Sequence, residues 1–388
     1  MNPVIVAITY NRPDSLKRLL KSLETAHYDD ETADLVISVD HWKDDNPCIK
    51  IAEDFSWPHG KKTVKVYEKN LGLKEHVMRC ADISKEYGSV ILLEDDMIVS
   101  PYFYLYAKQA SEYYRDKSEV FGIALYSATY NGLTGYPREK YHTGYDTYYE
   151  KWLTTWGELI FADRWAEFKL WYEENRDKEL KVDSDIPSMV PKWEKAWSKY
   201  VIYYMNKHEK WFVIPYVSYA TNAAESGVHG QKSAEWQVGM QYGRKQDYRF
   251  SDYDNAVKYD TFLERCDMDA VFERYGIAGS KRVICDLHGI RESYDSADYC
   301  FSVKLLPYKV LRSFGLIYHP IEQNIIENAQ GNDIFLYDLS VSAQPPKADP
   351  DMDYKLYRYY YPFLNKRKLI KYLLREIKKR VGFNEKSI

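Results

Sequence analysis

A regular alternation of predicted strands and helices in the first 130 residues constrains the fold of this chain most strongly. Residues 4–10 (VIVAITY) form a continuous β-branched run, as expected for a strand covered on both faces. Further strands are predicted at 35–40, 62–68, 89–94 and 120–127, with helical segments at 13–23, 74–87 and 101–114. Strands connected in this way form a mainly parallel sheet with helical crossovers. The sequence therefore predicts an α/β fold of the Rossmann-like kind.

Polar and irregular residues follow each of the first four predicted strands, in the sequences TYNRP, DHWKDD, EKNLGL and EDD. The carboxyl ends of parallel strands meet at one edge of an open α/β sheet, where ligands bind. The EDD triplet is Glu94, Asp95 and Asp96. Three adjacent carboxylates repel one another unless a cation lies among them, and hard divalent cations prefer oxygen ligands. The triplet therefore predicts a metal site, and a solvated acidic turn is the alternative.

The rest of the chain divides into regions of different pattern. Residues 144–230 contain two amphipathic helical segments between aromatic, glycine-containing loops, and complete a catalytic domain predicted at 1–234. Residues 235–346 contain short strands and turns, which predicts a smaller C-terminal α+β accessory region. Residues 347–388 are predicted to be a linker and a basic tail helix.

Composition narrows the classes of function. The 388 residues are 45% hydrophobic and 29% charged, with a net charge of −4, which indicates a globular protein and gives no reason to expect a nucleic-acid partner. The five cysteines are odd in number and include no C-x-x-C pair, which favours a reducing compartment over a zinc site or a disulfide framework. We expect a cytoplasmic protein without a signal peptide or a transmembrane helix.

Several segments resemble GT-A glycosyltransferases, specifically the N-acetylglucosaminyltransferase I type and bacterial capsule and lipopolysaccharide glycosyltransferases. In order, they are VIVAITYNRPDSLKRLLKSL, HVMRCADI leading to VILLEDDMIVSPYFYLY, TTWGELIFADRWAEF, and IPYVSYATN followed by SGVHGQ. They cover roughly residues 3–231, and the EDD segment is the most specific of them. The resemblance implies a GT-A fold, a nucleotide-diphosphate sugar donor such as a UDP-sugar, and Mn²⁺ or Mg²⁺ as cofactor. It also implies inverting transfer of a hexose or N-acetylhexosamine to a glycan or lipid-linked glycan acceptor in bacterial surface polysaccharide synthesis.

The resemblance also implies roles for individual residues. Asp96 would bind the metal directly, and Glu94 and Asp95 would face the ribose and the sugar. Contacts to the nucleotide would come from Thr9, Arg12, Asp40, Asn70 and His76. From the residues alone, these positions also have ordinary structural explanations, such as a strand-end turn for Asp40 and a packed histidine for His76.

The later loops would serve the sugar and the diphosphate. Trp156 offers an indole face to a sugar ring, and Gly157 permits close approach of the backbone, although a core tryptophan is the alternative. His229 lies between two glycines in SGVHGQ, in a loop that would close over the diphosphate and donate a hydrogen bond.

The general base is the least determined part of the site. The resembled family takes it from the start of the helix after the Trp-Gly loop, which here contains VPKWEKAWSKY and is expected to begin near Pro191. The family's acidic pair flanked by tryptophans is absent. Glu194, between Trp193 and Trp197, is the nearest carboxylate, and Glu158 is the second candidate.

The predicted tail helix is basic and amphipathic over residues 366–383. Its apolar stripe consists of Leu369, Ile370, Leu373, Leu374 and Ile377, and its basic residues are Lys366, Arg367, Lys368, Lys371, Arg375, Lys378, Lys379 and Arg380. This pattern is typical of a helix that lies on an anionic membrane surface, here the inner face of the cell membrane. A helix packed on its own domain is the alternative.

Two other functions fit the pattern. A sugar nucleotidyltransferase is also an α/β enzyme with acidic metal ligands, but those enzymes usually have a glycine-rich loop after the first strand, and TYNRPDSL contains no glycine. A non-catalytic carbohydrate-binding protein could retain the fold and lack the base. Turnover of a donor separates this second alternative from an enzyme.

Overall fold

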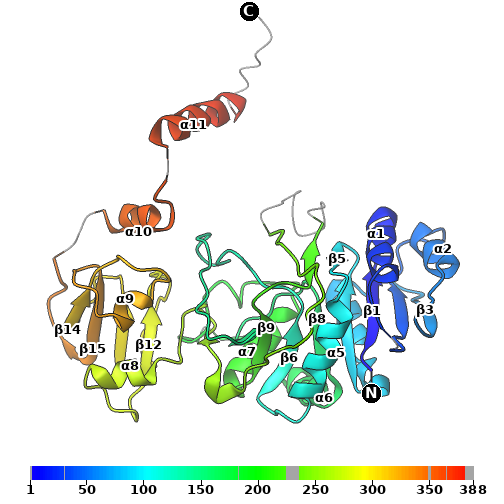
Figure 1. Cartoon of the computed structure of the whole chain (residues 1–388), viewed down its shortest axis with the longest axis horizontal. Coiled ribbons are helices and arrows are strands. Elements are labelled where there is room, and N and C mark those ends of the chain that lie inside the picture. The colour runs from blue at the N-terminus through cyan, green and yellow to red at the C-terminus, as the bar shows by residue number, and fades with distance from the viewer. Residues whose placement is uncertain are drawn as a thin grey trace, which may run out of the picture.

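A nine-stranded sheet forms the centre of the larger, N-terminal body of the molecule, called the large domain below (Figure 1). The computed structural model describes residues 2–29, 31–181, 183–223, 236–347, 351–363 and 365–380. The strand order is β11-β7-β9-β6-β8-β4-β1-β2-β3. The strands are β1 (Val4–Thr9), β2 (Leu35–Val39), β3 (Lys62–Val66), β4 (Ser89–Glu94), β6 (Val120–Ala124), β7 (Thr147–Glu150), β8 (Glu158–Phe161), β9 (Trp211–Pro215) and β11 (Lys258–Tyr259).

The strand directions confirm the predicted α/β fold. β3, β2, β1 and β4 are parallel, and β6 and β9 run in the same direction as these four. β8, β7 and β11 run against them. The edge at which β1, β2, β4 and β6 end is called the carboxyl edge below, and the opposite edge is called the amino edge.

Helices cover both faces of the sheet. One face packs against α1 (Pro13–Glu24), α2 (Pro47–Asp54) and α5 (Phe103–Tyr114). The other packs against α3 (Leu73–Ala81), α4 (Ser84–Tyr87), α6 (Ala162–Asn175) and α7 (Ser198–Lys207).

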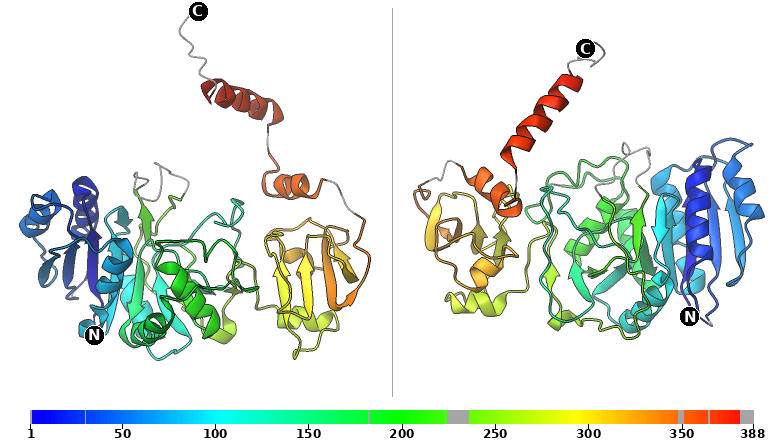
Figure 2. Two further views of the ribbon diagram at one scale, coloured as in Figure 1. Left: turned by 180° about the vertical axis from the view of Figure 1, so that it is seen from behind. Right: turned by 45° about the horizontal axis from the view of Figure 1, so that its top comes forward.

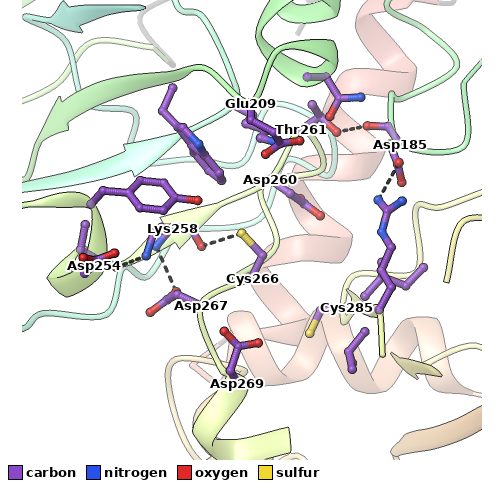
Figure 3. Close-up of a pocket in the computed structure, with 18 of the residues that line it drawn as sticks. Asp185, Glu209, Asp254, Lys258, Asp260, Thr261, Cys266, Asp267, Asp269 and Cys285 are labelled. Carbon is purple, nitrogen blue, oxygen red and sulfur yellow. Dashed lines mark hydrogen bonds and ion pairs between the residues drawn. The ribbon is translucent and has the colours of Figure 1, made fainter. Parts of the chain in front are cut away.

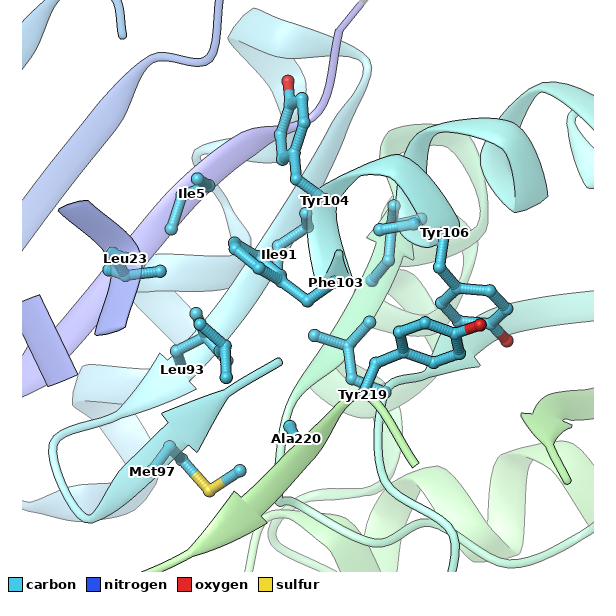
Figure 4. Packing of buried hydrophobic residues seen from close by; sticks show 14 of the residues in the cluster. Ile5, Leu23, Ile91, Leu93, Met97, Phe103, Tyr104, Tyr106, Tyr219 and Ala220 are labelled. Atoms are coloured by element: carbon cyan, nitrogen blue, oxygen red, sulfur yellow. The ribbon is translucent and has the colours of Figure 1, made fainter. Parts of the chain in front are cut away.

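The first five residues of β1, positions 4–8, are all apolar because the strand is buried on both faces. Ile5 and Ala7 belong to the first core, whereas Val4, Val6 and Ile8 belong to the second. Figure 4 shows the first core, in which side chains of β1, β4 and α5 meet. Because both faces are buried, the strand lacks the alternation of a half-exposed strand.

A short antiparallel ribbon follows the acidic triplet. β5 (Met97–Val99) pairs with β10 (Ala220–Asn222), and the backbone N–H of Ala223 donates to the carbonyl oxygen of Asp96 at 2.7 Å. In the ribbon, Met97 is opposite Asn222 and Ala220 is opposite Val99, and Figure 4 labels Met97 and Ala220 on the two strands. The ribbon therefore fixes the backbone on the C-terminal side of the triplet.

The C-terminal body contains a four-stranded sheet in the order β12-β13-β15-β14. Its elements are β12 (Val283–Asp286), β13 (Tyr299–Ser302), β14 (Tyr308–Phe314), β15 (Ile334–Ser342), α8 (Asp269–Arg274), α9 (Gln323–Ile326) and α10 (Met352–Tyr360). This agrees with an α+β region, but its limits differ from the predicted ones. β11 belongs to the large sheet, so the C-terminal core begins near Met268 rather than at residue 235. α10 lies in the predicted linker, yet Leu356 and Tyr360 are buried in this core.

The predicted tail helix is present as α11 (Lys366–Arg380). Both views of Figure 2 show it extending away from the large domain and from the C-terminal body. Among the described residues, no helix has the length and apolar character that crossing a membrane would require.

Candidate functional site

Arg12 connects the end of β1 to the acidic triplet after β4. Its guanidinium forms an ion pair with the carboxylate of Asp95, and its Nη1 lies 3.3 Å from Oδ2 of Asp96. The hydroxyl of Thr9 donates to Oδ2 of Asp95 at 2.7 Å. The strands thus bring Thr9 and Arg12 together with Asp95 and Asp96, which lie more than 80 positions later in the sequence. Asp95 is buried, whereas Asp96 remains 26% exposed and accessible to a ligand.

Glu94 is the third carboxylate, and among the described residues it has no hydrogen bond or ion pair. Burial and, to a smaller extent, the charges of Asp96 and Asp95 raise the pKa of Glu94 to about 8. One guanidinium therefore faces three carboxylates, and an additional cation would offset the remaining negative charge.

The carboxylates of the triplet are suitable ligands for a hard divalent cation whose remaining ligands would come from water and a bound substrate. No cluster of three or more His, Cys, Asp or Glu side chains suited to a metal ion occurs in the described part of the chain. Mg²⁺ and Mn²⁺ do not require such a cluster, because they are commonly held by one or two carboxylates together with waters and phosphate oxygens. Asp96, at the rim of the triplet, is the side chain that could hold the ion.

Glu158 lies beside Glu94 because β8 is antiparallel to its neighbours. Its Cα pairs with those of Leu92 on β4 and Ala124 on β6, so the first residue of β8 reaches the carboxyl edge. The side chain is buried, and its Oε2 has no hydrogen-bond partner among the described residues. Burial and the charge of Glu94 raise the pKa of Glu158 well above its ordinary value. Burial beside Glu94 therefore disfavours the charged form of Glu158, which is the form that a general base needs.

Asp40 shapes the loop after β3. Its carboxylate oxygens accept hydrogen bonds from the backbone N–H groups of His41, Leu71 and Gly72 at 2.9, 2.9 and 3.1 Å. Asn70 donates from its amide to the carbonyl oxygen of His41 at 2.9 Å. Both predicted nucleotide residues therefore orient the loop at the start of α3. A direct contact of either with a nucleotide stays a prediction.

His76 is a packed histidine in this structure. It is 2% exposed, its Nε2 lies 2.8 Å from the hydroxyl of Ser38, and its ring meets Tyr67 edge-on. Burial lowers the pKa of His76 to about 4, so the ring is neutral at pH 7. His76 therefore has the environment of a packed histidine, which is the structural alternative that the sequence left open.

An aromatic group stands beside the triplet at the carboxyl edge. Trp156 meets Tyr126 edge-on at 4.7 Å and Trp236 at 5.8 Å between ring centroids. Gly157 has a φ of +93°, which favours glycine, and an added Cβ would lie 3.3 Å from Leu125. We call Trp156, Tyr126 and Trp236 the aromatic wall.

Sequence reasoning missed two members of the aromatic wall. Tyr126 lies two residues after the end of β6, so its position near a strand end was a usable signal. Trp236 is brought in from a distant segment by a hydrogen bond from the Tyr126 hydroxyl to its carbonyl oxygen, at 2.8 Å. No local sequence pattern predicts that contact.

The expectation that a helix begins near Pro191 is wrong. α7 begins at Ser198, and Glu194 lies exposed in the turns before it. Burial and the charge of Lys74 lower the pKa of Lys199, and the charge of Glu194 opposes them. These three charged side chains therefore lie near one another, beside the first turn of α3 at the carboxyl edge. His229, the remaining predicted site residue, lies outside the described residues.

A polar cavity of about 650 Å³ lies elsewhere, between the amino edge of the large sheet and the C-terminal body. Trp211, the first residue of β9, lines it, together with Lys151, Cys266 and Asp267. Figure 3 shows acidic side chains from both bodies around this space. Because the acidic triplet is at the carboxyl edge, this cavity is separate from the candidate site.

Comparisons with known proteins give similarity in structure only. No protein-family model matches the chain, and no curated protein matches it significantly. Residues 1–349 of S. aureus TarS, in complex with UDP-GlcNAc, match with a TM-score of 0.37 and 15% identity over 59% of this chain and 60% of that one. The mannosyltransferase PcManGT from Pyrobaculum calidifontis, with GDP-Man and Mn²⁺, matches with a TM-score of 0.34 and 10% identity over 55% of each chain.

GalNAc-T7, with UDP, GalNAc and Mn²⁺, matches with a TM-score of 0.39 and 13% identity over 55% of this chain and 41% of that one. The chain thus spans less than two thirds of each of these proteins. The similar structures hold a sugar nucleotide or a nucleotide with its sugar, but overlap at this level assigns no activity. A functional assignment must therefore rest on the site at the carboxyl edge.

Proposed function

We propose that this chain is a metal-dependent, inverting glycosyltransferase that uses a nucleotide-diphosphate sugar, most simply a UDP-sugar. The observation that carries the proposal is the meeting of the acidic triplet, Arg12 and the aromatic wall at one edge of the sheet. A sugar nucleotide carries a diphosphate and a sugar ring. The first group calls for a cation beside carboxylates, and the second calls for flat apolar surfaces with polar neighbours.

Each part of the site has a proposed task. Asp96 would hold Mn²⁺ or Mg²⁺, which when bound stabilises the charge that develops on a leaving diphosphate. Arg12 orients Asp95 and Asp96 and restrains their mutual repulsion. Trp156 presents its indole to the sugar, and the loop held by Asp40 lies where the nucleotide would bind. Glu194 is the proposed general base for the acceptor hydroxyl, because it is the exposed carboxylate of the turn before α7.

The acceptor is proposed to be a glycan or a lipid-linked glycan of a bacterial surface polysaccharide. The basic tail helix supports a lipid-linked acceptor, because it would hold the enzyme at the surface where such molecules reside.

The test is a screen of UDP- and GDP-sugars with the full chain, with Mn²⁺ and with a chelator. We expect binding of one donor and slow release of its nucleoside diphosphate, both lost in chelator and in Asp96→Asn. Binding without any release, even with acceptor extracts, would favour the non-catalytic carbohydrate-binding alternative. Binding to no sugar nucleotide would overturn the proposal.

A further inference from the structure

Helix α11 exposes two contrasting surfaces. Four apolar side chains, spaced to share one face, are each more than half exposed: Ile370, Leu373, Leu374 and Ile377. The helix also exposes six basic side chains: Lys366, Arg367, Lys368, Lys371, Arg375 and Lys378. Phe363, just before the helix, is 99% exposed. The apolar face of α11 is therefore exposed in the structure, and the alternative of a helix packed on its own domain is wrong.

The segment that leads to α11 is fixed beside the carboxyl edge. Tyr360, at the end of α10, stacks on Tyr136 with ring centroids 4.7 Å apart. The hydroxyl of Tyr361 donates to the carbonyl oxygen of Gly135 at 3.2 Å. Gly135 and Tyr136 belong to the loop that follows β6, which ends at the carboxyl edge. Figure 1 shows α11 on the side of the molecule toward which β1 runs.

We propose that α11 lies on an anionic lipid surface and holds the carboxyl edge toward that surface, so that the acceptor is a lipid-anchored molecule. This inference deepens the proposed glycosyltransferase function and rests on it for the identity of the acceptor. The apolar face would enter the boundary between headgroups and acyl chains. The neighbouring lysines and arginines would contact anionic headgroups. Glu376 is the one acidic residue of the helix, so the charge of α11 complements an anionic partner.

The first experiment measures sedimentation of the full chain with phosphatidylcholine vesicles, with and without phosphatidylglycerol. We expect binding only to the anionic vesicles, and weaker binding at high salt. The triple variant Lys371→Gln, Arg375→Gln, Lys378→Gln should lose on the order of 100-fold in affinity, because each basic residue strengthens such binding roughly fivefold. The double variant Leu373→Ser, Ile377→Ser should also release the protein.

A matched control removes the same charge elsewhere. Lys50→Gln, Lys61→Gln and Lys178→Gln change three exposed lysines of the catalytic domain. This variant should keep wild-type binding. Equal loss in the control and the tail variant, or no binding by the wild type at low salt, would overturn the inference. Binding of α11 to an RNA duplex in place of vesicles would overturn it as well.

Hydrogen exchange on the vesicles tests the orientation. We expect protection of α11 and of the loop at 129–137, with unchanged exchange in α8 on the far side. Protection of α8 in place of that loop would contradict the orientation. Donor hydrolysis by the tail variants, measured without vesicles, should match that of the wild type. A failed vesicle experiment with intact hydrolysis rejects the lipid surface alone, whereas absent hydrolysis with intact vesicle binding rejects the proposed function alone.

Discussion

The guanidinium of Arg12 is ion-paired with Asp95, a carboxylate whose side chain is only 2% exposed. Replacing Arg12 with Gln leaves that charge buried beside Glu94 and Asp96. We expect the free energy of unfolding to fall by about 3 kcal/mol, because the loss of one partner of a buried pair leaves an uncompensated charge. Urea denaturation measures the change. Lys17→Gln is the control, since its pair with Asp14 is exposed and should contribute less than about 1 kcal/mol. Similar losses in both variants would show that burial of the Arg12–Asp95 pair does not increase its contribution to the free energy of unfolding.

Asp96→Asn should abolish stabilisation by metal without loss of the fold. The variant keeps the shape of the side chain and removes the charge that would hold a divalent ion. In a thermal shift assay with UDP, Mn²⁺ should raise the Tm of the wild type and not that of the variant. Asp14→Asn, an exposed carboxylate of α1, should respond like the wild type. A full Mn²⁺ response in Asp96→Asn would place the ion elsewhere.

The two candidate bases are expected to differ in kinetics. Glu194→Gln cannot take a proton and should lose on the order of 10² in kcat, with little change in donor affinity. Burial and the charge of Glu94 raise the pKa of Glu158 and so disfavour its charged form. We therefore expect Glu158→Gln to change kcat by less than about threefold. The reverse order of effects would make Glu158 the base. A loss under about tenfold in both would reject both carboxylates.

His76 should make the stability of the fold depend on pH. Its pKa in the folded protein is about 4, below the ordinary 6.5, so the unfolded chain gains a proton first as the pH falls. Stability is therefore full above pH 6.5 and is lost toward pH 4. Between pH 7 and pH 5 the loss from this group is about 2 kcal/mol.

Urea denaturation at both pH values tests this expectation. His76→Gln should remove that part of the pH dependence, although it lowers stability at pH 7. His142→Gln, which replaces an exposed histidine, should keep the wild-type difference between the two pH values. An unchanged difference in His76→Gln would assign the pH dependence to other groups.

The strands and helices of the first 130 residues were predictable because burial on both faces leaves a direct record in the sequence. β1 is apolar at consecutive positions since each side chain enters one of two cores. The acidic triplet was predictable for the same reason, because its charges begin where the buried strand β4 ends. The resulting contact between Arg12 and Asp95 follows from the parallel pairing of β1 with β4.

The missed features depend on contacts between distant residues. β5 and β10 have three residues each and pair across more than 100 positions. β11 has two residues, too few for a periodic pattern. The start of α7 was misplaced because tryptophans set the geometry there. Trp193 packs edge-on against Trp152, and Trp197 packs against Trp165, which overrides the helical spacing of the sequence.

Because β8 is antiparallel to both of its neighbours, the segment before it has almost no spare length. β7 ends at the amino edge, where Lys151 lines the polar cavity, and β8 begins with Glu158 at the carboxyl edge. The seven residues 151–157 must cross the sheet, and an extended chain covers at most about 3.5 Å per residue. Deleting one residue here would pull β8 by one position and turn Glu158 to the opposite face. Length is therefore more tightly constrained in this segment than side-chain identity at its half-buried positions 154–156, so the surroundings of Trp156 should tolerate substitutions better than insertions or deletions.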